Sequence, residues 1–126
     1  MNNPAIFWGK VVVGEQRGKS LGFPTVNVRL HKNIPEGIYV SVATVDRRQH
    51  EALTFIGSAK TFGEKEVKAE TYFLSYNGNI YGKWISVRLF LKIRGNKKFE
   101  SAMELVLQMK KDKRYAKEYF KKNKHV

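Results

Sequence analysis

Residues 85–93 read Ile-Ser-Val-Arg-Leu-Phe-Leu-Lys-Ile, and they carry the clearest structural signal in the chain. The odd-numbered positions are all apolar, and polar Ser86, Arg88 and Lys92 lie between them. Such alternation is typical of a β-strand that buries one face. Residues 66–74 alternate in the same way, and Asn77-Gly78 between the two stretches is a strong signal for a tight turn. The sequence therefore predicts a hairpin formed by 66–74 and 85–93.

The rest of the chain divides into a strand-rich part and a helical end. Strands are predicted at residues 5–13, 38–46 and 51–57. Strands followed by helix, without βαβ alternation, predict a mainly β protein. We expect a small antiparallel closed β-barrel over about 5–94 and a helical end over about 101–122, which together form one domain.

The helical end begins with a recognisable start signal. Ser101-Ala102-Met103-Glu104 is a capping box. The apolar residues that follow on one helical face are Ala102, Leu105, Val106 and Met109. A second short helix is expected to carry Tyr115, Tyr119 and Phe120.

Charge and composition restrict the class of protein. The 126 residues include no cysteine, which excludes disulfides, thiolate metal sites and cysteine nucleophiles. A net charge of +13 favours anionic partners, although the eight basic residues in 110–126 are also typical of a solvated helical face. Because no signal peptide or long apolar run is present, we expect a cytoplasmic monomer without membrane association.

The octet Ser-Leu-Gly-Phe-Pro-Thr-Val-Asn at residues 20–27 is the strongest functional signal. Pro24 fixes one φ angle and favours an extended conformation at Phe23. Thr25 and Asn27 are two residues apart, so in an extended segment their side chains point the same way. A hydroxyl and an amide carbonyl are oxygen ligands that suit Mg²⁺ with phosphate. A plain turn leading into a strand is the alternative interpretation.

Two other features suggest phosphate chemistry. The segment from Gly14 to Ser20 is one residue too short for a P-loop and is not followed by a helix start, but its backbone and Lys19 could cradle phosphates. An exposed turn is the alternative. Glu70 lies within the strand predicted at 66–74, where a solvent-facing position is the simpler interpretation.

These motifs, taken in order, resemble the riboflavin kinase family over nearly the whole chain. The octet is similar to the family's Gly-Phe-Pro-Thr-Ala-Asn signature, with Val26 in place of Ala. The other matching stretches are 9–14, 17–22, Ile34-Pro35-Glu36-Gly37-Ile38-Tyr39, Ile56-Gly57 with Thr61-Phe62-Gly63, Ala69-Glu70-Thr71, Ile80-Tyr81-Gly82, Ile93-Arg94, Lys97-Lys98-Phe99, and Leu105 with Gln108 and Asp112.

The resemblance implies a riboflavin kinase-like Greek-key barrel that transfers the ATP γ-phosphoryl group to the 5′-hydroxyl of riboflavin, giving FMN and ADP. It implies Glu70 as the catalytic base and Thr25 and Asn27 as ligands of Mg²⁺, with Zn²⁺ or Mn²⁺ as alternatives. The implied ATP-binding residues are Gly14, Lys19, Thr25, Phe73, Ser75 and Tyr81. The implied flavin-binding residues are Arg94, Lys97 and Phe99. The chain lacks the adenylyltransferase domain of many bacterial versions, so we expect it to stop at FMN.

Three positions depart from the family pattern: Lys60, Ser75-Tyr76 and Asn96. They leave open a non-catalytic flavin-binding sensor built on the same barrel. The positive charge, six Tyr and eight Phe leave open a nucleic-acid-binding β-barrel as well. Because neither alternative needs Thr25, Asn27 and Glu70 together, we expect the kinase, with small-molecule ligands and no nucleic-acid partner.

Overall fold

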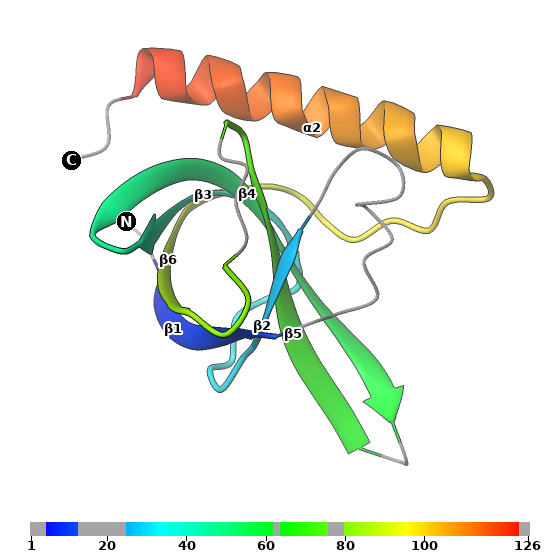
Figure 1. Ribbon diagram of the computed structural model, residues 1–126. Helices are drawn as coiled ribbons and strands as arrows, with labels where there is room; N and C mark the ends of the chain where they lie inside the picture. Colours follow the sequence, from blue (N-terminus) through cyan, green and yellow to red (C-terminus); the bar gives the residue numbers. More distant parts are fainter. Residues whose placement is uncertain (1–4, 13–24, 62–63, 76–79, 124–126) are drawn as a thin grey trace.

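The computed structural model describes residues 5–12, 25–61, 64–75 and 80–123, and the side chains of all of these except 58–61 and 64–66. These residues form six strands and one long helix, which lies across one side of the strands (Figure 1). The elements are β1 (Ala5–Val12), β2 (Val26–Arg29), β3 (Gly37–Val45), β4 (Arg48–Thr61), β5 (Glu64–Phe73), β6 (Trp84–Arg94) and α2 (Ala102–Lys122).

The strands close into an antiparallel barrel in the order β1-β2-β5-β4-β3-β6. Strands β3, β4 and β5 follow one another as hairpins, and β6 returns to lie beside β3, which is a Greek-key arrangement. The predicted mainly β barrel with a C-terminal helix is therefore confirmed.

The predicted hairpin between 66–74 and 85–93 is wrong, although both stretches are strands. Strand β5 pairs with β2 and β4, whereas β6 pairs with β1 and β3. Both edges of β5 are therefore occupied. One edge pairs with β2, and the other pairs with β4 in a ladder that runs from Ala52↔Phe73 to Thr61↔Glu64. Asn77-Gly78 lies outside the described residues. Alternation identified the strands, but pairing depends on contacts that are distant in sequence.

A tight turn that sequence inspection did not identify joins β3 to β4. Asp46 and Arg47 have φ angles of +50° and +68°, the positive values that a type I′ hairpin turn requires at both central residues. The ladder then runs through nine registered pairs from Val45↔Arg48 to Gly37↔Ile56. The sequence signal for this turn is weak, because Arg47 occupies the second central position, where glycine is usual.

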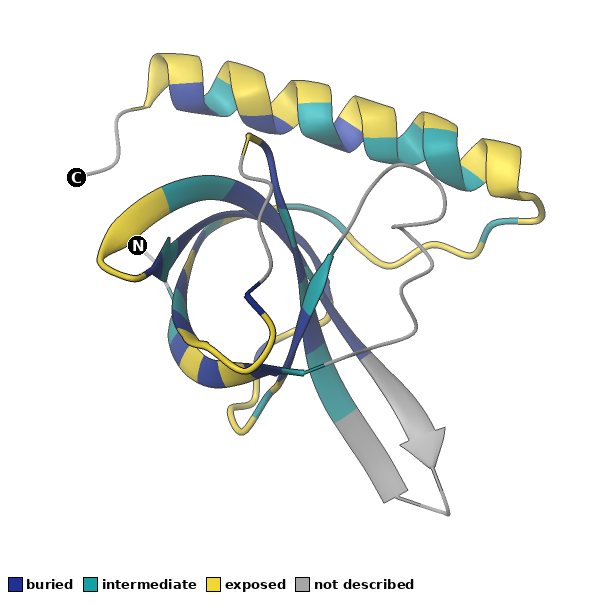
Figure 2. Ribbon diagram, viewed as in Figure 1, coloured by how far each residue is buried: buried dark blue, intermediate teal, exposed yellow. Residues whose placement is uncertain are grey.

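The apolar side chains form two clusters, one inside the barrel and one under the helix. The interior cluster includes Phe7, Val28, Tyr39, Ile56 and Ala69. The second cluster joins the outer surface of β3 and β4 to α2 and consists of Ile38, Val40, Val42, Leu53, Leu74, Ala116 and Phe120, all buried. In Figure 2 the side of α2 that faces the barrel is buried or half-buried, and its outer side is exposed.

The second short helix that the sequence predicted is absent from the described residues, because α2 continues unbroken to Lys122. The predicted cap is confirmed: Ser101 Oγ accepts a hydrogen bond from the Glu104 backbone N–H at 3.2 Å. The helix residues that are fully buried lie closer to the C-terminus than the sequence predicted, at Asp112, Ala116 and Phe120. Leu105, Val106 and Met109 are only half-buried, and Ala102 is exposed. Residues 102–122 contain no glycine or proline that would interrupt the helix.

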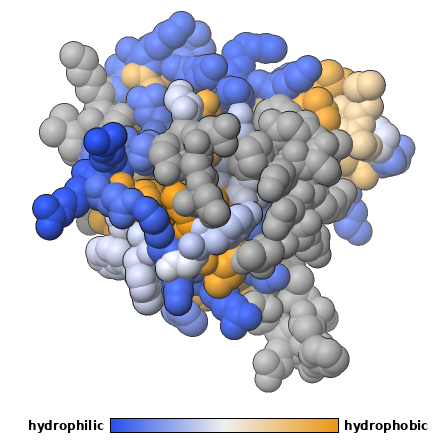
Figure 3. Space-filling model, viewed as in Figure 1, coloured by the Kyte–Doolittle hydropathy of each residue, from blue (hydrophilic) through white to orange (hydrophobic). Residues whose placement is uncertain are grey.

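The outer surface of α2 is mainly hydrophilic. Figure 3 shows hydrophilic side chains along the upper edge of the molecule, where α2 lies, with a hydrophobic group at one end. At the N-terminal end of the helix, Met103 and Leu107 are exposed. The helix is not long and apolar enough to cross a membrane, and no other helix occurs in the described part of the chain.

Three buried hydroxyl groups form a chain of hydrogen bonds inside the barrel. Thr54 Oγ1 lies 2.8 Å from Ser41 Oγ and 3.0 Å from Thr71 Oγ1, so the chain links strands β3, β4 and β5. All three residues are essentially inaccessible to solvent. Buried hydroxyls cost free energy unless they are hydrogen-bonded, so Thr54 satisfies two neighbours at once.

We expect Thr54→Val to lower the free energy of unfolding by about 1–3 kcal/mol, because it leaves Ser41 and Thr71 without their shared partner. Urea unfolding followed by circular dichroism would measure the change. Thr44→Val, at a half-buried position on the outer surface of β3, is the matched control and should change stability little. Equal effects of the two substitutions would show that the hydroxyl chain adds nothing specific.

Candidate active site

The predicted catalytic and flavin residues are placed along one row of cross-strand neighbours. The registers Asn27↔Glu70, Glu70↔Phe55, Phe55↔Ile38 and Ile38↔Arg94 run across β2, β5, β4, β3 and β6 in turn. The residues next in sequence to Asn27 and Glu70, Val28 and Ala69, lie in the interior cluster. Because successive side chains of a strand point to opposite faces, this row lies on the outer surface of the barrel.

Asn27 and Glu70 form one end of this row and are direct partners on antiparallel strands. Residues directly opposite each other have Cβ atoms about 4.5–5.5 Å apart, so the amide and the carboxylate lie within reach of one ligand. Asn27 is 2 % exposed and Glu70 is half-buried. Thr25, also half-buried, immediately precedes β2. The structure therefore brings Asn27 and Glu70 together, and Thr25 lies two residues before Asn27 in the chain.

The Asn27 amide fits a phosphate-bound divalent cation. Its Nδ2 atom is buried and has no hydrogen-bond partner in the described structure. Such an atom calls for an acceptor outside the described residues, and a phosphate oxygen or a metal-bound water would serve. The side chains of Thr25, Asn27 and Glu70 offer oxygen atoms, which Mg²⁺ prefers, and Mg²⁺ needs only one or two protein ligands alongside phosphates. Among the described residues, no group of three or more His, Cys, Asp or Glu could hold a metal by itself.

Arg94 forms the other end of the row and connects it to the helix. Its Nε lies 3.0 and 3.2 Å from the two Asp112 carboxylate oxygens, and its Nη2 lies 2.8 Å from Oδ2. Gln108 Nε2 donates to the same carboxylate at 3.0 Å. The Asp112 side chain is 7 % exposed and the Arg94 side chain 20 % exposed. This planar, fork-like ion pair fixes the guanidinium at the end of β6.

The loop between β6 and α2 places an aromatic ring between two cations. The centre of the Phe99 ring lies 6.0 Å from the Arg94 guanidinium carbon and 5.8 Å from Lys97 Nζ. Asn96, one of the departures from the family pattern, donates from Nδ2 to Glu36 Oε1 at 3.0 Å and so links this loop to the segment before β3. All three predicted flavin-binding residues are therefore grouped at one place.

Phe55 lies between the two ends of the row, and the sequence did not mark it as a site residue. It is half-buried and packs against the cluster under the helix. Its ring occupies the space above Gly57, where an added Cβ would overlap the ring. Only the register of β4 against β3 and β5 places Phe55 between Glu70 and Arg94, so no local sequence signal could have identified it.

Of the remaining predicted ATP-binding residues, the structure describes Phe73, Ser75 and Tyr81. Phe73 is buried in the interior cluster, with its ring centre 5.6 Å from that of His50. Burial, together with the charge of Arg48, lowers the pKa of His50. Ser75 and Tyr81 are exposed, at the end of β5 and before β6. Gly14 and Lys19 lie outside the described residues, so their roles remain predictions.

Comparison with known proteins agrees with this arrangement. The family model described as flavokinase, riboflavin kinase, matches residues 1–120. The chain belongs to the riboflavin kinase family. It is 33 % identical, over 95 % of its length, to the bifunctional riboflavin kinase/FMN adenylyltransferase of Bacillus subtilis.

Two solved structures share the fold of this riboflavin kinase family member. A protein named as a macrolide-efflux protein, from Streptococcus pneumoniae, superimposes with a TM-score of 0.84 at 32 % identity, covering 90 % of this chain and 38 % of that one. The riboflavin kinase of Trypanosoma brucei gives a TM-score of 0.67 at 26 % identity and covers 96 % of this chain and 82 % of that one. The chain spans between 19 % and 47 % of the length of the first three curated relatives it matches.

We expect Asp112→Ala to lower the free energy of unfolding by about 3 kcal/mol, because it leaves the partly buried Arg94 guanidinium without its counter-charge. Denaturant unfolding would measure the loss. Glu118→Ala on the same helix is the control. Its ion pair with Lys121 is exposed, with a 3.6 Å separation, and should contribute less than about 0.5 kcal/mol. Similar losses in the two variants would contradict a special role for the Arg94–Asp112 pair.

Proposed function

We propose that this chain is a riboflavin kinase that transfers the γ-phosphoryl group of ATP to the 5′-hydroxyl of riboflavin. The observation that carries the proposal is the Asn27↔Glu70 pair on the outer surface of the barrel, in a chain of the riboflavin kinase family. The pair combines a buried amide, whose Nδ2 atom has no partner among the described residues, with a half-buried carboxylate. A binding-only protein would not need that combination.

In the proposed reaction, the 5′-hydroxyl oxygen of riboflavin forms a bond to the γ-phosphorus while the bond from that phosphorus to the β,γ-bridging oxygen breaks. FMN and ADP are the products. The Glu70 carboxylate accepts the proton that the hydroxyl loses. Phosphoryl transfer depends mainly on positioning and on neutralising charge, so one carboxylate and a few oxygen and nitrogen donors are sufficient on the protein side.

The proposed nucleotide end of the site lies at Thr25 and Asn27. These residues would hold the divalent cation together with the phosphates, and Mg²⁺ suits their oxygen donors best. When bound, the cation would neutralise negative charge on the transferred group. The Asn27 Nδ2 atom, which has no partner in the described part of the chain, would donate to a phosphate oxygen or to a water beside the cation.

The row also suggests how riboflavin lies. Glu70 and Arg94 are three strand spacings apart, about 14 Å along the curved surface. A flavin ring near Arg94, Lys97 and Phe99 would meet a planar aromatic surface and two cations, which attract an electron-rich ring system. The ribityl chain would then extend past Phe55 and bring its terminal hydroxyl to Glu70.

Glu70→Gln tests the role of the base. The substitution keeps the shape but cannot accept the proton, so we expect the rate of FMN formation to fall by about 10²–10⁴-fold, with little change in ATP binding. Chromatographic detection of FMN after incubation with riboflavin, ATP and Mg²⁺ measures the rate. Glu118→Gln on the exposed surface of α2 is the control. Near-normal turnover by Glu70→Gln would remove Glu70 from this role.

The same assay on the unmodified chain tests the alternative of a non-catalytic flavin-binding sensor. Riboflavin binding without FMN formation would favour that alternative.

Asn27→Ala tests the nucleotide and metal end separately. We expect the Mg²⁺ concentration needed for half-maximal FMN formation to rise by about 10-fold or more. Mg²⁺ titrations at fixed ATP and riboflavin would measure it, with Asn33→Ala, at an exposed position, as the control. A thermal unfolding scan would check that the variant folds. An unchanged Mg²⁺ requirement in folded Asn27→Ala would rule out metal or phosphate contact at this residue.

A further inference from the structure

Both tryptophans of the chain are exposed on one side of the barrel. Trp8 on β1 is 63 % exposed and Trp84 on β6 is 69 % exposed, and the sequence contains no other tryptophan. Aromatic side chains that lie exposed near one another often mark an interaction site, and tryptophan is enriched at such sites. The riboflavin kinase activity proposed above uses neither residue.

Aromatic and cationic side chains alternate along this surface. The registers Lys10↔Trp84, Trp8↔Ser86 and Ile6↔Arg88 place them in successive outward-facing rows of β1 and β6. Next along β6 comes Phe90, whose ring centre lies 5.9 Å from the Arg88 guanidinium carbon. Lys32 Nζ lies 5.9 Å from the centre of the Trp8 ring and donates to the Ile6 carbonyl. Stacking surfaces and positive charges therefore occur together along the two strands.

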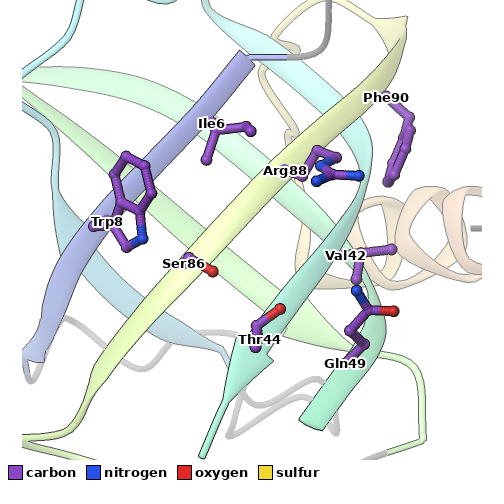
Figure 4. Close-up of a pocket in the computed structure, with 8 residues that line it drawn as sticks. All are labelled: Ile6, Trp8, Val42, Thr44, Gln49, Ser86, Arg88 and Phe90. Carbon is purple, nitrogen blue, oxygen red and sulfur yellow. The ribbon is translucent and has the colours of Figure 1, made fainter. Parts of the chain in front are cut away.

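A cavity of about 150 Å³ adjoins this surface where β6 lies beside β3 (Figure 4). It is lined by Ile6, Trp8, Val42, Thr44, Gln49, Ser86, Arg88 and Phe90. Within the described part of the chain, Arg88 has no carboxylate partner, and the side chains of Thr44, Gln49 and Ser86 make no hydrogen bond. The cavity thus brings a guanidinium, two hydroxyls and an amide together beside an indole ring.

The β6 part of this surface is separate from the Asn27–Glu70 pair, whereas β1 adjoins β2, the strand of Asn27. In the closed order of strands, β6 lies opposite β5, so Trp84, Ser86 and Arg88 are on the far side of the barrel from Glu70. Strand β6 reaches the candidate active site only at its end, through Arg94. A ligand that stacks on Trp84 and contacts Arg88 could therefore bind while the kinase site is occupied.

We propose that this side of the barrel binds single-stranded nucleic acid. Bases would stack on Trp8 and Trp84, and the phosphates would contact Lys10, Lys32 and Arg88. Base stacking on aromatic side chains within a positively charged surface is the general mode of sequence-tolerant single-strand binding. The net charge of +13 provides long-range attraction for such a polyanion.

The size of the cavity favours a strand over a free nucleotide. Pockets that enclose a whole small ligand usually have about 300–1,000 Å³, and this one is smaller. It would hold one unit of a longer ligand that continues along β1 and β6. A duplex fits less well, because its bases are stacked on one another and cannot lie flat on the indoles. Although the sequence led us to expect no nucleic-acid partner, it could not place both tryptophans and Arg88 on one surface.

Intrinsic fluorescence provides a direct test, because both tryptophans lie on the proposed surface. We expect a 12-nucleotide single-stranded RNA or DNA to quench the tryptophan emission of the full chain, with AMP and a 12-base-pair duplex far less effective. A fluorescently labelled strand would give affinities by anisotropy. Trp8→Ala should weaken binding by about 10-fold, since stacking of one base contributes about 1–3 kcal/mol, and Trp8→Phe should restore most of it. FMN formation by these variants should be unchanged.

Charge provides a second, independent readout. Arg88→Gln should weaken binding and reduce the slope of log affinity against log salt by about 0.7, the value for one phosphate contact on a single strand. Lys117→Gln, with the same loss of charge at an exposed position on α2, is the matched control and should leave that slope nearly unchanged. The proposal would be overturned if the single strand did not quench tryptophan, if Trp8→Ala bound as tightly as the unmodified chain, or if Lys117→Gln and Arg88→Gln had equal effects.

Discussion

Closure of the barrel is the constraint on which the other features depend. Because each strand is bonded to a neighbour on both edges, the alternation of side chains fixes which residues face the interior and which face outward. Val28 and Ala69 face inward, so Asn27 and Glu70 must face outward, directly opposite each other. A shift of one residue between β2 and β5 would separate them and turn one side chain inward. The candidate catalytic pair is therefore a consequence of register.

The Arg94–Asp112 pair connects the helix to this arrangement. Asp112 accepts hydrogen bonds from both Arg94 and Gln108, which satisfies a buried carboxylate that would otherwise be costly. The same guanidinium lies beside the Phe99 ring. The position of the proposed flavin surface therefore depends on how α2 packs on the barrel. The apolar contacts of Ala116 and Phe120 help to hold α2, and with it Asp112, in place.

The outer surface of the barrel divides into two parts with different chemistry. On the helix side, α2 and the loop after β6 cover apolar residues and leave a row that ends in Asn27 and Glu70. The described outward-facing residues of β1, and those of β6 from Trp84 to Arg88, do not belong to the cluster under α2, and Trp8 and Arg88 remain accessible. One small barrel thus provides two chemically distinct surfaces, because only one is shielded from water.

The sequence by itself determined the mainly β class, the approximate positions of most strands, the helix start at Ser101 and the family, because alternation, capping and the ordered motifs are local patterns. Through that resemblance it also marked Asn27, Glu70 and Arg94 as candidate site residues, and their roles stay predictions. It did not determine that β5 pairs with β2, that α2 is one helix docked through Asp112, or that Phe55 lies between Glu70 and Arg94. Those features were decided by the tertiary structure, because strand pairing and helix docking depend on contacts between residues far apart in the chain.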